Sequence, residues 1–417
     1  MTVREQVVTA ARGAREAGRK LSTLSAEVRA DALRAMAGAL RDHAAEIIEA
    51  NARDMKAGEE AGLSSAMLDR LLLNDERVDK IAVALEEIAD LPDPVGHVLK
   101  EWTIENGLHI QRVAAPIGVI GIIYESRPNV TADAAGLCIK SGNACVLRGG
   151  SEAIHSNVAL AQVLAEAAVA AGLPAGCVAM IPTTDREAVQ VMCRLPEYID
   201  LIIPRGGESL IRAVSENSQV PVLKHYRGMT QIYVDAAADL DLAVKLVHNA
   251  KVQRPGVCNA VENLYVHAAA PEVLRAIVAD LQAADVEVRG CERTMALAEG
   301  VVPASDEDFD TEYLDLILAI MVVDSLDHAL DQIAQHTSGL TEAIITEDQA
   351  AADRFLREVD SAAVYHNAST RLTDGGVYGL GAEIGVSTDK IHARGPVGAA
   401  ELTIYKYVCR GNGQIRT

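Results

Sequence analysis

The chain has 417 residues, of which 49% are hydrophobic but only 3% aromatic, so aliphatic side chains must fill its cores. A formal net charge of −21 argues against a nucleic-acid partner, because an acidic surface repels a phosphate backbone. The polar start of the chain does not resemble a signal peptide, and the longest apolar run, around 114–123, has only about ten residues, so we expect a soluble cytoplasmic protein without a membrane segment.

The first ninety residues have the pattern of helices that end at a pair of prolines. Val28, Leu33, Met36 and Leu40 recur at the three- to four-residue spacing of one helix face. The helical region stops at 91–95, because two prolines in three residues cannot continue a helix.

Residues 102–113 have the pattern of a β-hairpin. Two strand-like runs flank Asn106-Gly107, the dipeptide best suited to a tight hairpin turn. A lone two-stranded hairpin is marginally stable in water, so it needs a further strand from its own chain or from a second subunit. The run 402–409 is the candidate partner by composition. The alternative is an ordinary surface hairpin.

From residue 116 onward, short aliphatic runs alternate with helical segments. We predict strands at 117–124, 144–147, 177–181 and 199–203, and helices at 134–139, 152–171, 185–193 and 210–214. Ser151 is the expected N-cap of the helix 152–171. Strands and helices that alternate at these lengths predict right-handed parallel units, and therefore an α/β fold with a doubly wound sheet.

Two strand-to-helix turns carry paired glycines. These are Arg148-Gly149-Gly150-Ser151 and Arg205-Gly206-Gly207. Glycine lets backbone amides approach a phosphate, and a helix N-terminus favours negative charge there. Neither turn matches a known dinucleotide or P-loop pattern, so each taken alone is read as a structural turn. Together, at the same end of neighbouring strands, they predict a nucleotide-binding crevice with Arg148 and Arg205 adding positive charge.

A second unit of the same kind begins after residue 230. We predict strands at 231–234, 262–267, 315–323, 343–345 and 362–365, and helices at 238–248, 271–283 and 326–333. The stretch 375–385 is too rich in glycine to be regular. It predicts a long loop, and loops of this kind often close over a site.

Cys258 is the candidate nucleophile. It lies in the turn 253–259, which Pro and Gly punctuate, directly before a predicted strand. Nearby positive charge such as Arg254 favours the reactive thiolate. The alternative is an inert, half-buried small side chain. The seven cysteines form no C-x-x-C pair and no histidine pair has zinc spacing, so we predict reduced thiols and no metal site.

Several long motifs, in order, resemble one enzyme family. They are Pro116–Asn129, Gln253–Glu262, Val364–Arg371, Gly379–Gly385 and His392–Pro396. Together they resemble the gamma-glutamyl phosphate reductases, the glutamate-5-semialdehyde dehydrogenases of proline synthesis, which are a branch of the aldehyde dehydrogenase superfamily. The likeness runs from about residue 5 to the end of the chain.

This resemblance implies an aldehyde dehydrogenase-like α/β fold with three parts. They are a Rossmann-like NADP-binding domain (1–101 and 114–229, with part of 366–397), an α/β catalytic domain (230–365), and a β-hairpin oligomerisation flap (102–113 and 398–417). The family implies NADPH-dependent reduction of L-glutamyl 5-phosphate to L-glutamate 5-semialdehyde and phosphate, the second step of proline biosynthesis from glutamate. It also implies a homo-oligomer, and docking with glutamate 5-kinase is chemically plausible because the substrate is unstable.

The resemblance places Cys258 on the nucleophile position, with its backbone amide in an oxyanion hole. Wider aldehyde dehydrogenases supply a second donor from an asparagine in the segment corresponding to 124–129, where Asn129 is the candidate. Hydrolytic relatives activate water with a glutamate. The corresponding stretch here, 225–228, has no carboxylate, which favours exchange of a thioester with phosphate.

The resemblance also suggests binding residues, each with a structural alternative. Arg148 corresponds to a basic residue beside the adenosine ribose, which suits the extra phosphate of NADP, and Glu312 to the glutamate that holds the nicotinamide ribose. Glu312 is alternatively a surface carboxylate. The candidates for the anionic groups of the substrate are Arg127, Arg254 and Arg371, and those for its amino-acid end are Asn367, Ser369 and Glu383. Each arginine is alternatively a structural ion-pair partner.

Two competing readings keep the fold and change the function. An acylating aldehyde dehydrogenase that uses coenzyme A would keep Cys258 and lose the dependence on phosphate. A non-catalytic, nucleotide-binding member of the fold would bind NADPH, yet its Cys258 would react no faster than the other six thiols.

Overall fold

The computed structural model describes residues 1–416 and divides the chain into two compact units. Unit 1 comprises residues 1–224, 379–386 and 391–416, and unit 2 comprises residues 225–378 and 387–390. The division falls after Lys224, a few residues before the expected domain boundary at 229/230. Unit 2 is therefore a nearly continuous stretch of chain inserted into unit 1.

The N-terminal part of unit 1 is helical, as the spacing of apolar residues predicts. Its helices are α1 (Val3–Leu21), α2 (Ala26–Asp42), α3 (Ala44–Glu60), α4 (Ser65–Leu71) and α5 (Asp75–Asp90). Side chains of Thr2, Ser25, Ser64 and Asn74 accept a backbone hydrogen bond at the starts of α1, α2, α4 and α5. The buried apolar stripe of α2, with Leu33, Met36 and Leu40, belongs to the core of unit 1.

A four-stranded parallel sheet forms the centre of unit 1. Its order is β5-β4-β3-β6, with β3 (Val119–Tyr124), β4 (Ala144–Arg148), β5 (Val178–Met180) and β6 (Leu201–Arg205). The connecting helices are α6 (Asn129–Lys140), η1 (Ser151–Ala153), α7 (Ile154–Ala170), α8 (Glu187–Met192) and α9 (Glu208–Asn217). Every residue of β3 and β4 is buried, which explains their continuous aliphatic sequence.

The predicted N-cap at Ser151 is wrong. Ser151 lies inside the 3-10 turn η1, which Gly150 precedes, and it makes no capping hydrogen bond. The carboxylate of Asp54 instead accepts hydrogen bonds from the backbone N–H of His155 at 3.1 Å and of Ser156 at 2.7 Å. A residue from α3 thus satisfies the first donors of α7, which a local capping rule cannot detect.

By length and composition alone, α7 and the turn before it, residues 151–170, are apolar enough to cross a membrane. From the sequence we predict no membrane segment, because the apolar run considered there is at 114–123. In the structure, Leu160, Val163 and Leu164 of this helix are buried in the core of unit 1, and Asn51 of α3 donates to the buried Ser156 hydroxyl at 3.0 Å. These contacts are typical of a core helix.

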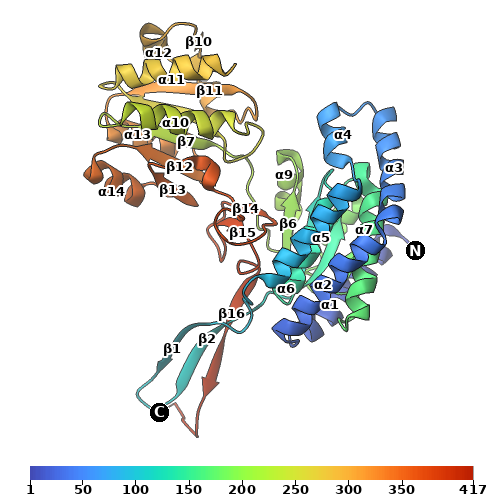
Figure 1. The fold of residues 1–417 in the computed structure, drawn as a ribbon. Coiled ribbons are helices and arrows are strands. Elements are labelled where there is room, and N and C mark those ends of the chain that lie inside the picture. The colour runs from blue at the N-terminus through green and yellow to red at the C-terminus, as the bar shows by residue number, and fades with distance from the viewer. Residues whose placement is uncertain (417) are drawn as a thin grey trace. The chain divides into compact units, whose positions relative to one another are not determined.

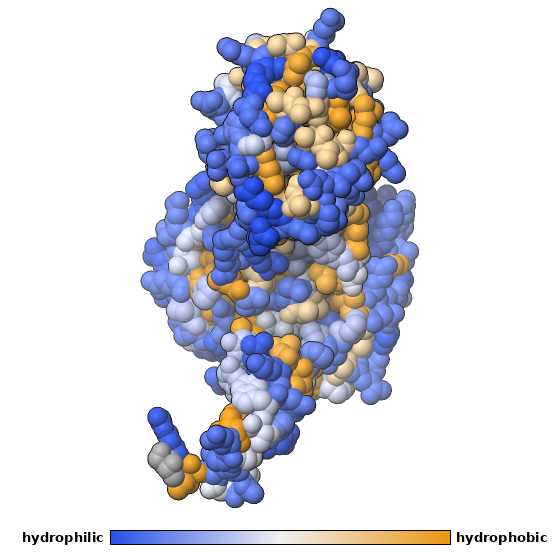
Figure 2. Space-filling model, turned by 90° about the vertical axis from the view of Figure 1, so that its left-hand side faces the viewer, coloured by the Kyte–Doolittle hydropathy of each residue, from blue (hydrophilic) through white to orange (hydrophobic). Residues whose placement is uncertain are grey.

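The predicted hairpin exists and pairs with the C-terminal strand. β1 (Val98–Thr103), β2 (His109–Pro116) and β16 (Thr403–Arg410) form an antiparallel sheet of order β1-β2-β16. The turn uses Gly107 at φ +84°, in the left-handed region that glycine tolerates. This sheet projects away from the helices of its own unit (Figure 1). On the face drawn in Figure 2, residues of intermediate hydropathy (white) and hydrophobic residues (orange) extend along this sheet. Leu99, Tyr405 and Tyr407 of the sheet are exposed.

Unit 2 is built on a seven-stranded parallel sheet of order β10-β9-β11-β8-β7-β12-β13. Its strands are β7 (Thr230–Val234), β8 (Val261–His267), β9 (Glu287–Gly290), β10 (Val302–Pro303), β11 (Ile317–Val323), β12 (Thr341–Ile345) and β13 (Ala363–His366). Its helical segments are α10 (Leu240–Val252), α11 (Pro271–Ala283), α12 (Glu292–Leu297), η2 (Asp306–Asp310), α13 (Leu326–His336), α14 (Gln349–Glu358) and η3 (Thr370–Leu372). The predicted elements do not include the short β9, β10 and α12 or the ten-residue helix α14.

Alternation along the strands gives this sheet two separate cores. Ile232 and Val234 of β7 join a cluster with residues of α10 and α11. Tyr233, which lies between them, joins a second cluster with residues of α13 and α14, including Ile333 and Phe355. Successive side chains of a strand point to opposite faces, so helices cover both faces of the sheet (Figure 1).

The glycine-rich stretch 375–385 is irregular, as predicted. Regular structure begins only at its last residue, in the two-stranded pair of β14 (Gly385–Ser387) and β15 (Gly395–Val397). Gly379, Gly381 and Gly385 all have φ values in the positive region. The chain passes from unit 2 back to unit 1 within this loop.

Candidate active site

Cys258 lies in the turn between α10 and β8 in unit 2. Its side chain is half-buried, whereas the next residues, Asn259 and Ala260, are buried. The N–H of Ala260 donates to the carbonyl of Val257 at 3.0 Å and so tightens the turn around the cysteine. A fixed, partly accessible thiol is the environment that a nucleophilic cysteine requires.

Asn259 ties this turn to the segment that follows β13. Its Nδ2 donates to the carbonyl of Thr373 at 2.8 Å, and its own carbonyl accepts from the hydroxyl of Thr370 at 2.9 Å. The guanidinium of Arg371 donates to the Asn259 side-chain oxygen and to Oε1 of Gln253, the latter at 2.8 Å. The structure therefore brings the predicted substrate-binding residue Arg371 to the Cys258 turn.

Positive charge gathers at this turn. Burial lowers the pKa of Arg371, and the neighbouring charge of Arg254 lowers it further, while Asp374 and Cys258 act in the opposite direction. The guanidinium of Arg371 thus lies within electrostatic reach of Arg254 and of the Cys258 thiol. Positive charge near a thiol favours its thiolate and would also favour an anionic substrate.

Gly228 packs directly against Cys258. A Cβ added at Gly228 would lie 2.4 Å from the carbonyl oxygen and 2.5 Å from the Cα of Cys258. The hydroxyl of Thr230 donates to the same carbonyl at 2.9 Å, and the N–H of Gly228 donates to Oε1 of Glu312 at 2.9 Å. The segment 225–228, expected to correspond to the water-activating motif of hydrolytic relatives, therefore presents glycine backbone to the cysteine. Glu312 is half-buried.

The other predicted substrate residues of unit 2 are held by structural contacts. Buried Ser369 donates to Oδ1 of Asn249 at 2.6 Å and accepts from the N–H of Arg371. Asn367 adopts φ +53°, and its amide exchanges two hydrogen bonds of 3.0 Å with the backbone of Thr346. Ser369 thus adjoins Arg371, whereas the amide of Asn367 is engaged by the end of β12.

In unit 1, the first glycine-bearing turn follows β4. Arg148 is 8% exposed, and its Nη2 donates to the carbonyl of Thr184 at 2.7 Å, while its buried Nε makes no hydrogen bond. Burial lowers the pKa of its guanidinium, which the charge of Glu152 partly offsets. Gly149 and Gly150 are buried, and Ser151 is exposed. A Cβ on Gly150 would lie 2.6 Å from a Glu152 carboxylate oxygen and 3.2 Å from the backbone of Glu125.

The second glycine-bearing turn follows β6 and binds a carboxylate of the protein itself. The carboxylate of Glu125, which follows β3, accepts from the N–H of Gly207 at 2.8 Å at the start of α9. A Cβ on Gly206 would meet the same carboxylate at 2.5 Å. Arg205 lies against Gly385, where a Cβ would come within 2.9 Å of its guanidinium. This helix start is therefore already paired with a side chain of the protein.

The remaining predicted residues also lie in unit 1. Asn129 begins α6, and its Nδ2 donates to Oδ2 of Asp133 at 2.9 Å. Arg127 is exposed beside Pro128, and Glu383 is half-buried in the glycine-rich loop. Burial raises the pKa of Asp133 to about 6. Asn129 is thus held by a carboxyl group whose ionised form is disfavoured.

We expect Asp133→Asn to stabilise the protein at pH 8 and not at pH 3.5. The folded-state pKa of Asp133 is raised, so protonation stabilises the fold below the unfolded pKa near 4, and this contribution is lost as the pH rises to about 6. Because Asp133 is only partly buried, we expect a gain of only about 1 kcal/mol above pH 6. Urea unfolding at both pH values measures it. An equal gain at pH 3.5 would contradict the assignment.

The other cysteines differ from Cys258 in their surroundings. Cys138, Cys145, Cys177 and Cys193 are buried, and burial raises the pKa of Cys177 to about 12. At Cys291, burial raises the thiol pKa, but hydrogen bonds led by that of Thr294 outweigh it and lower the pKa below its usual value. Cys409 is exposed. Cys291 and Cys409 are therefore the thiols that compete with Cys258 for an alkylating reagent.

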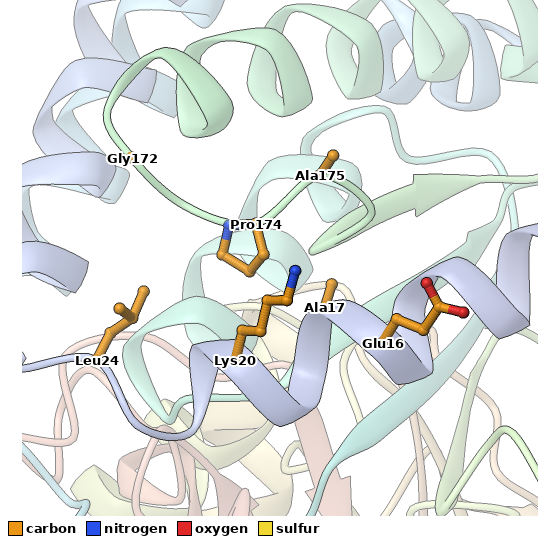
Figure 3. Close-up of a pocket in the computed structure, with 7 residues that line it drawn as sticks. All are labelled: Glu16, Ala17, Lys20, Leu24, Gly172, Pro174 and Ala175. Atoms are coloured by element: carbon orange, nitrogen blue, oxygen red, sulfur yellow. The ribbon is translucent and has the colours of Figure 1, made fainter.

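A surface pocket of about 440 Å³ lies elsewhere, between α1 and the loop that follows α7 (Figure 3). It is lined by Glu16, Ala17, Lys20, Leu24, Gly172, Pro174 and Ala175. Its lining includes none of the predicted site residues.

Comparison with known proteins decides the family. The model of the aldehyde dehydrogenase family matches residues 2–295. Gamma-glutamyl phosphate reductase of Moorella thermoacetica is 55% identical over 417 residues, which is the full length of both chains. The chain belongs to the gamma-glutamyl phosphate reductase family.

Solved structures agree with this family and its fold. The crystal structure of gamma-glutamyl phosphate reductase from Thermotoga maritima is 48% identical, has a TM-score of 0.97 and covers 99% of this chain and 100% of its own. An acetylating aldehyde dehydrogenase from Geobacillus thermoglucosidasius, at 17% identity and a TM-score of 0.69, shares the fold and covers 100% of this chain and 98% of its own. The aldehyde dehydrogenase-like α/β fold is thus confirmed. Members of this family are oxidoreductases that use a nicotinamide cofactor.

Sequence reasoning missed the contacts between distant segments. Gly228 lies thirty residues before Cys258, and only its place in a motif drew attention to that stretch. Glu125, which directly follows a predicted strand, pairs with the 205–207 turn although 82 positions separate it from Gly207. The signal that could have found it is a lone carboxylate at the carboxyl end of a buried strand.

Proposed function

We propose that this protein reduces L-glutamyl 5-phosphate to L-glutamate 5-semialdehyde and phosphate with NADPH, as the second step of proline biosynthesis from glutamate. The relatives named gamma-glutamyl phosphate reductase support the substrate, at 51–55% identity over 99% or more of this chain. The observation that carries the proposal is the Cys258 turn, where the thiol is half-buried and Arg371 donates to Asn259 and Gln253 of the same turn. We further propose a soluble, cytoplasmic homo-oligomer.

Cys258 is the nucleophile in this mechanism. Its thiolate attacks the acyl carbon, the carbon–sulfur bond forms, and the bond to the phosphate oxygen breaks, so that phosphate leaves with the electron pair. The backbone N–H of Cys258 stabilises the oxyanion during this step. The guanidinium groups of Arg254 and Arg371 bind anionic groups of the substrate, because a guanidinium matches phosphate and carboxylate oxygens in pairs.

The resulting thioester must be protected from water. Gly228, which packs against Cys258, carries no side chain that could act as a base, and Glu312 is engaged by the Gly228 N–H. A thioester that is not hydrolysed can be reduced, or in the reverse direction can be cleaved by phosphate. This arrangement supports a phosphate-coupled reaction over oxidation to a free acid.

The nicotinamide cofactor, when bound, supplies the hydride that reduces the thioester. One feature of unit 1 fits such a group: the buried Nε of Arg148, at the carboxyl end of β4, makes no hydrogen bond. We propose that Arg148, Gly149, Gly150 and Ser151 hold the adenosine side. Arg205, Gly206 and Gly207 are proposed for the pyrophosphate region, although Glu125 already pairs with Gly207. Glu312 is proposed for the nicotinamide ribose.

The remaining assignments are proposals that rest on placement and resemblance. Asn129 is proposed as a second oxyanion donor, and Arg127, Asn367, Ser369 and Glu383 as substrate contacts. The three-stranded sheet of β1, β2 and β16 is proposed as the oligomerisation flap, because Leu99, Tyr405 and Tyr407 on it are exposed. Docking with glutamate 5-kinase stays a prediction based on the instability of the acyl phosphate.

The reverse reaction tests this function. The purified protein is mixed with glutamate semialdehyde and NADP⁺, and the absorbance of NADPH is followed with and without inorganic phosphate. We expect turnover only with phosphate. Turnover without phosphate would mean that water reaches the thioester. Turnover that requires coenzyme A in place of phosphate would support the acylating alternative, and fast alkylation of Cys258 without any turnover would reopen the substrate.

Arg148→Gln is expected to raise the KM for NADPH about 10- to 100-fold, while the KM for NADH changes much less. A charge-assisted hydrogen bond contributes about 1.5–3 kcal/mol, and only NADPH carries the additional phosphate. Initial rates with both cofactors measure the effect. Arg148→Lys is the matched control, since it keeps the charge without the planar fork. Equal losses with NADPH and NADH would show that Arg148 only holds the carbonyl of Thr184.

A further inference from the structure

A buried ion pair connects the residues on either side of the Cys258 turn. Lys251 lies in the last turn of α10 and Glu262 at the start of β8, on either side of the turn. Their Nζ and Oε2 atoms are 2.8 Å apart, and both side chains are 0% exposed. The pair therefore links the residues that lead into the turn with those that leave it.

The second carboxylate oxygen of Glu262 holds another segment. Oε1 accepts from the N–H of Leu314 at 3.2 Å. Leu314 has φ +54°, a conformation that costs energy for any residue with a Cβ. Its side chain is 46% exposed, so burial of the leucine does not hold the backbone there. The hydrogen bond that the N–H of Leu314 donates to Glu262 restrains the backbone in this conformation. The Leu314 carbonyl in turn faces Gly256 of the Cys258 turn.

The segment that contains Leu314 also contains Glu312, and Glu312 is linked to Cys258 through Gly228. Glu312 accepts from the N–H of Gly228, and Gly228 packs on the backbone of Cys258. One carboxylate, that of Glu262, thus fixes both the turn of the proposed nucleophile and the residue proposed to hold the nicotinamide ribose.

Stability alone does not explain a buried pair of this kind. Burial raises the pKa of Glu262 to about 7 and lowers that of Lys251, in spite of their mutual attraction. Removing two charges from water costs more than a hydrophobic pair of similar size would. An apolar pair cannot make directional hydrogen bonds. The carboxylate of Glu262 has two oxygens at a fixed angle, one of which accepts from Lys251 and the other from Leu314.

We propose that Lys251 and Glu262 are positioning residues that lock the Cys258 turn to the segment carrying Glu312, so that the thiolate and Glu312 are held as one rigid group within unit 2. This inference deepens the proposed function and rests on it for its catalytic consequence. Neither residue touches the reacting atoms. A shift of the nucleophile by about 1 Å is enough to lower a rate about 10²-fold.

Two variants separate positioning from folding. Lys251→Met with Glu262→Leu replaces the pair by apolar side chains of similar size, which is compatible with a stable core. Glu262→Gln keeps an acceptor oxygen for the N–H of Leu314, and its amide nitrogen can donate to Lys251, whose buried amine is uncharged once its anionic partner is gone. For each variant we measure the melting temperature, the rate of Cys258 alkylation by iodoacetamide with peptide mapping, and kcat and KM separately. Alkylation needs neither substrate nor cofactor.

We expect the double variant to melt near the wild-type temperature, while kcat and the alkylation rate at Cys258 fall about 10²-fold and KM changes much less. Glu262→Gln should retain at least about a tenth of both rates, since it keeps the geometry. Wild-type rates in the double variant, or equal losses in both variants, would overturn the proposal. If the double variant does not melt cooperatively, Lys251→Met alone replaces it, since it also removes the donor to Glu262, and the same outcomes apply. Failure of the phosphate-dependent assay would remove the proposed function but leave the alkylation result valid.

Discussion

Cys258→Ala is expected to lower the phosphate-dependent rate by at least about 10⁴-fold without loss of fold. Removal of the nucleophile in a covalent mechanism eliminates the intermediate itself, and only binding and orientation remain. The side chain is half-buried and small, so alanine leaves a minor void there. Turnover of glutamate semialdehyde with NADP⁺ and phosphate measures the rate, and a melting curve checks the fold.

The matched controls for Cys258→Ala are Cys291→Ala and Cys409→Ala. Cys291 is the other half-buried thiol and Cys409 the exposed one, so these are the sites at which alkylation could mislead. Both variants should keep wild-type turnover, and iodoacetamide should still inactivate them through Cys258. Uniform slow labelling of all seven cysteines, with undiminished activity in Cys258→Ala, would exclude the thioester mechanism.

Gly228→Ala is expected to lower kcat about 10²-fold. The added Cβ would lie within 2.5 Å of the Cys258 backbone, a distance that real contacts do not reach, so the turn itself must move. The displacement would also strain the bond between the Gly228 N–H and Glu312. We expect a loss of stability of about 1–3 kcal/mol, which urea unfolding measures.

Gly256→Ala is the control for Gly228→Ala. Gly256 belongs to the same turn, but a Cβ there would meet its nearest neighbour, the carbonyl oxygen of Leu314, at 3.6 Å, which is an ordinary contact. The kcat and the rate of Cys258 alkylation of this variant should stay within about twofold of wild type, because Gly256 is exposed and an added methyl group there displaces nothing. Equal losses in the two variants would show that the turn tolerates no side chain anywhere, and that the close approach of Gly228 is not special.

Local sequence patterns predicted those helices and turns whose ends are marked by a proline or a glycine. The helix predicted at 271–283 is α11 with the same bounds, because Pro271 marks its first turn. The hairpin turn at Asn106-Gly107 and its pairing with the C-terminal strand are also as predicted. The Cys258 turn was recognisable because Pro255 and Gly256 interrupt an otherwise helical and then strand-like sequence.

Contacts between distant residues were not predictable in this way. Asp54 caps α7 from a different helix, and Ser151 therefore has no capping role. Glu262 has the appearance of an ordinary residue at the start of a strand, and only the fold shows that it reaches Lys251 and Leu314. Asn367 looked like a substrate ligand from its motif, but its amide is engaged by the backbone of Thr346, and its role in binding stays a prediction.

The pairing of β2 with β16 has a consequence for how the chain folds during synthesis. Pro116 and Thr403 face one another in this sheet, so a loop of about 290 residues must close before the third strand can add to the hairpin. Unit 2 accounts for most of that loop as an uninterrupted stretch, and it can become compact as soon as it leaves the ribosome. Until β16 emerges, β2 presents an open edge to other nascent chains. We therefore expect chaperone dependence to be concentrated in this late interval, after unit 2 is made and before the last strand is added.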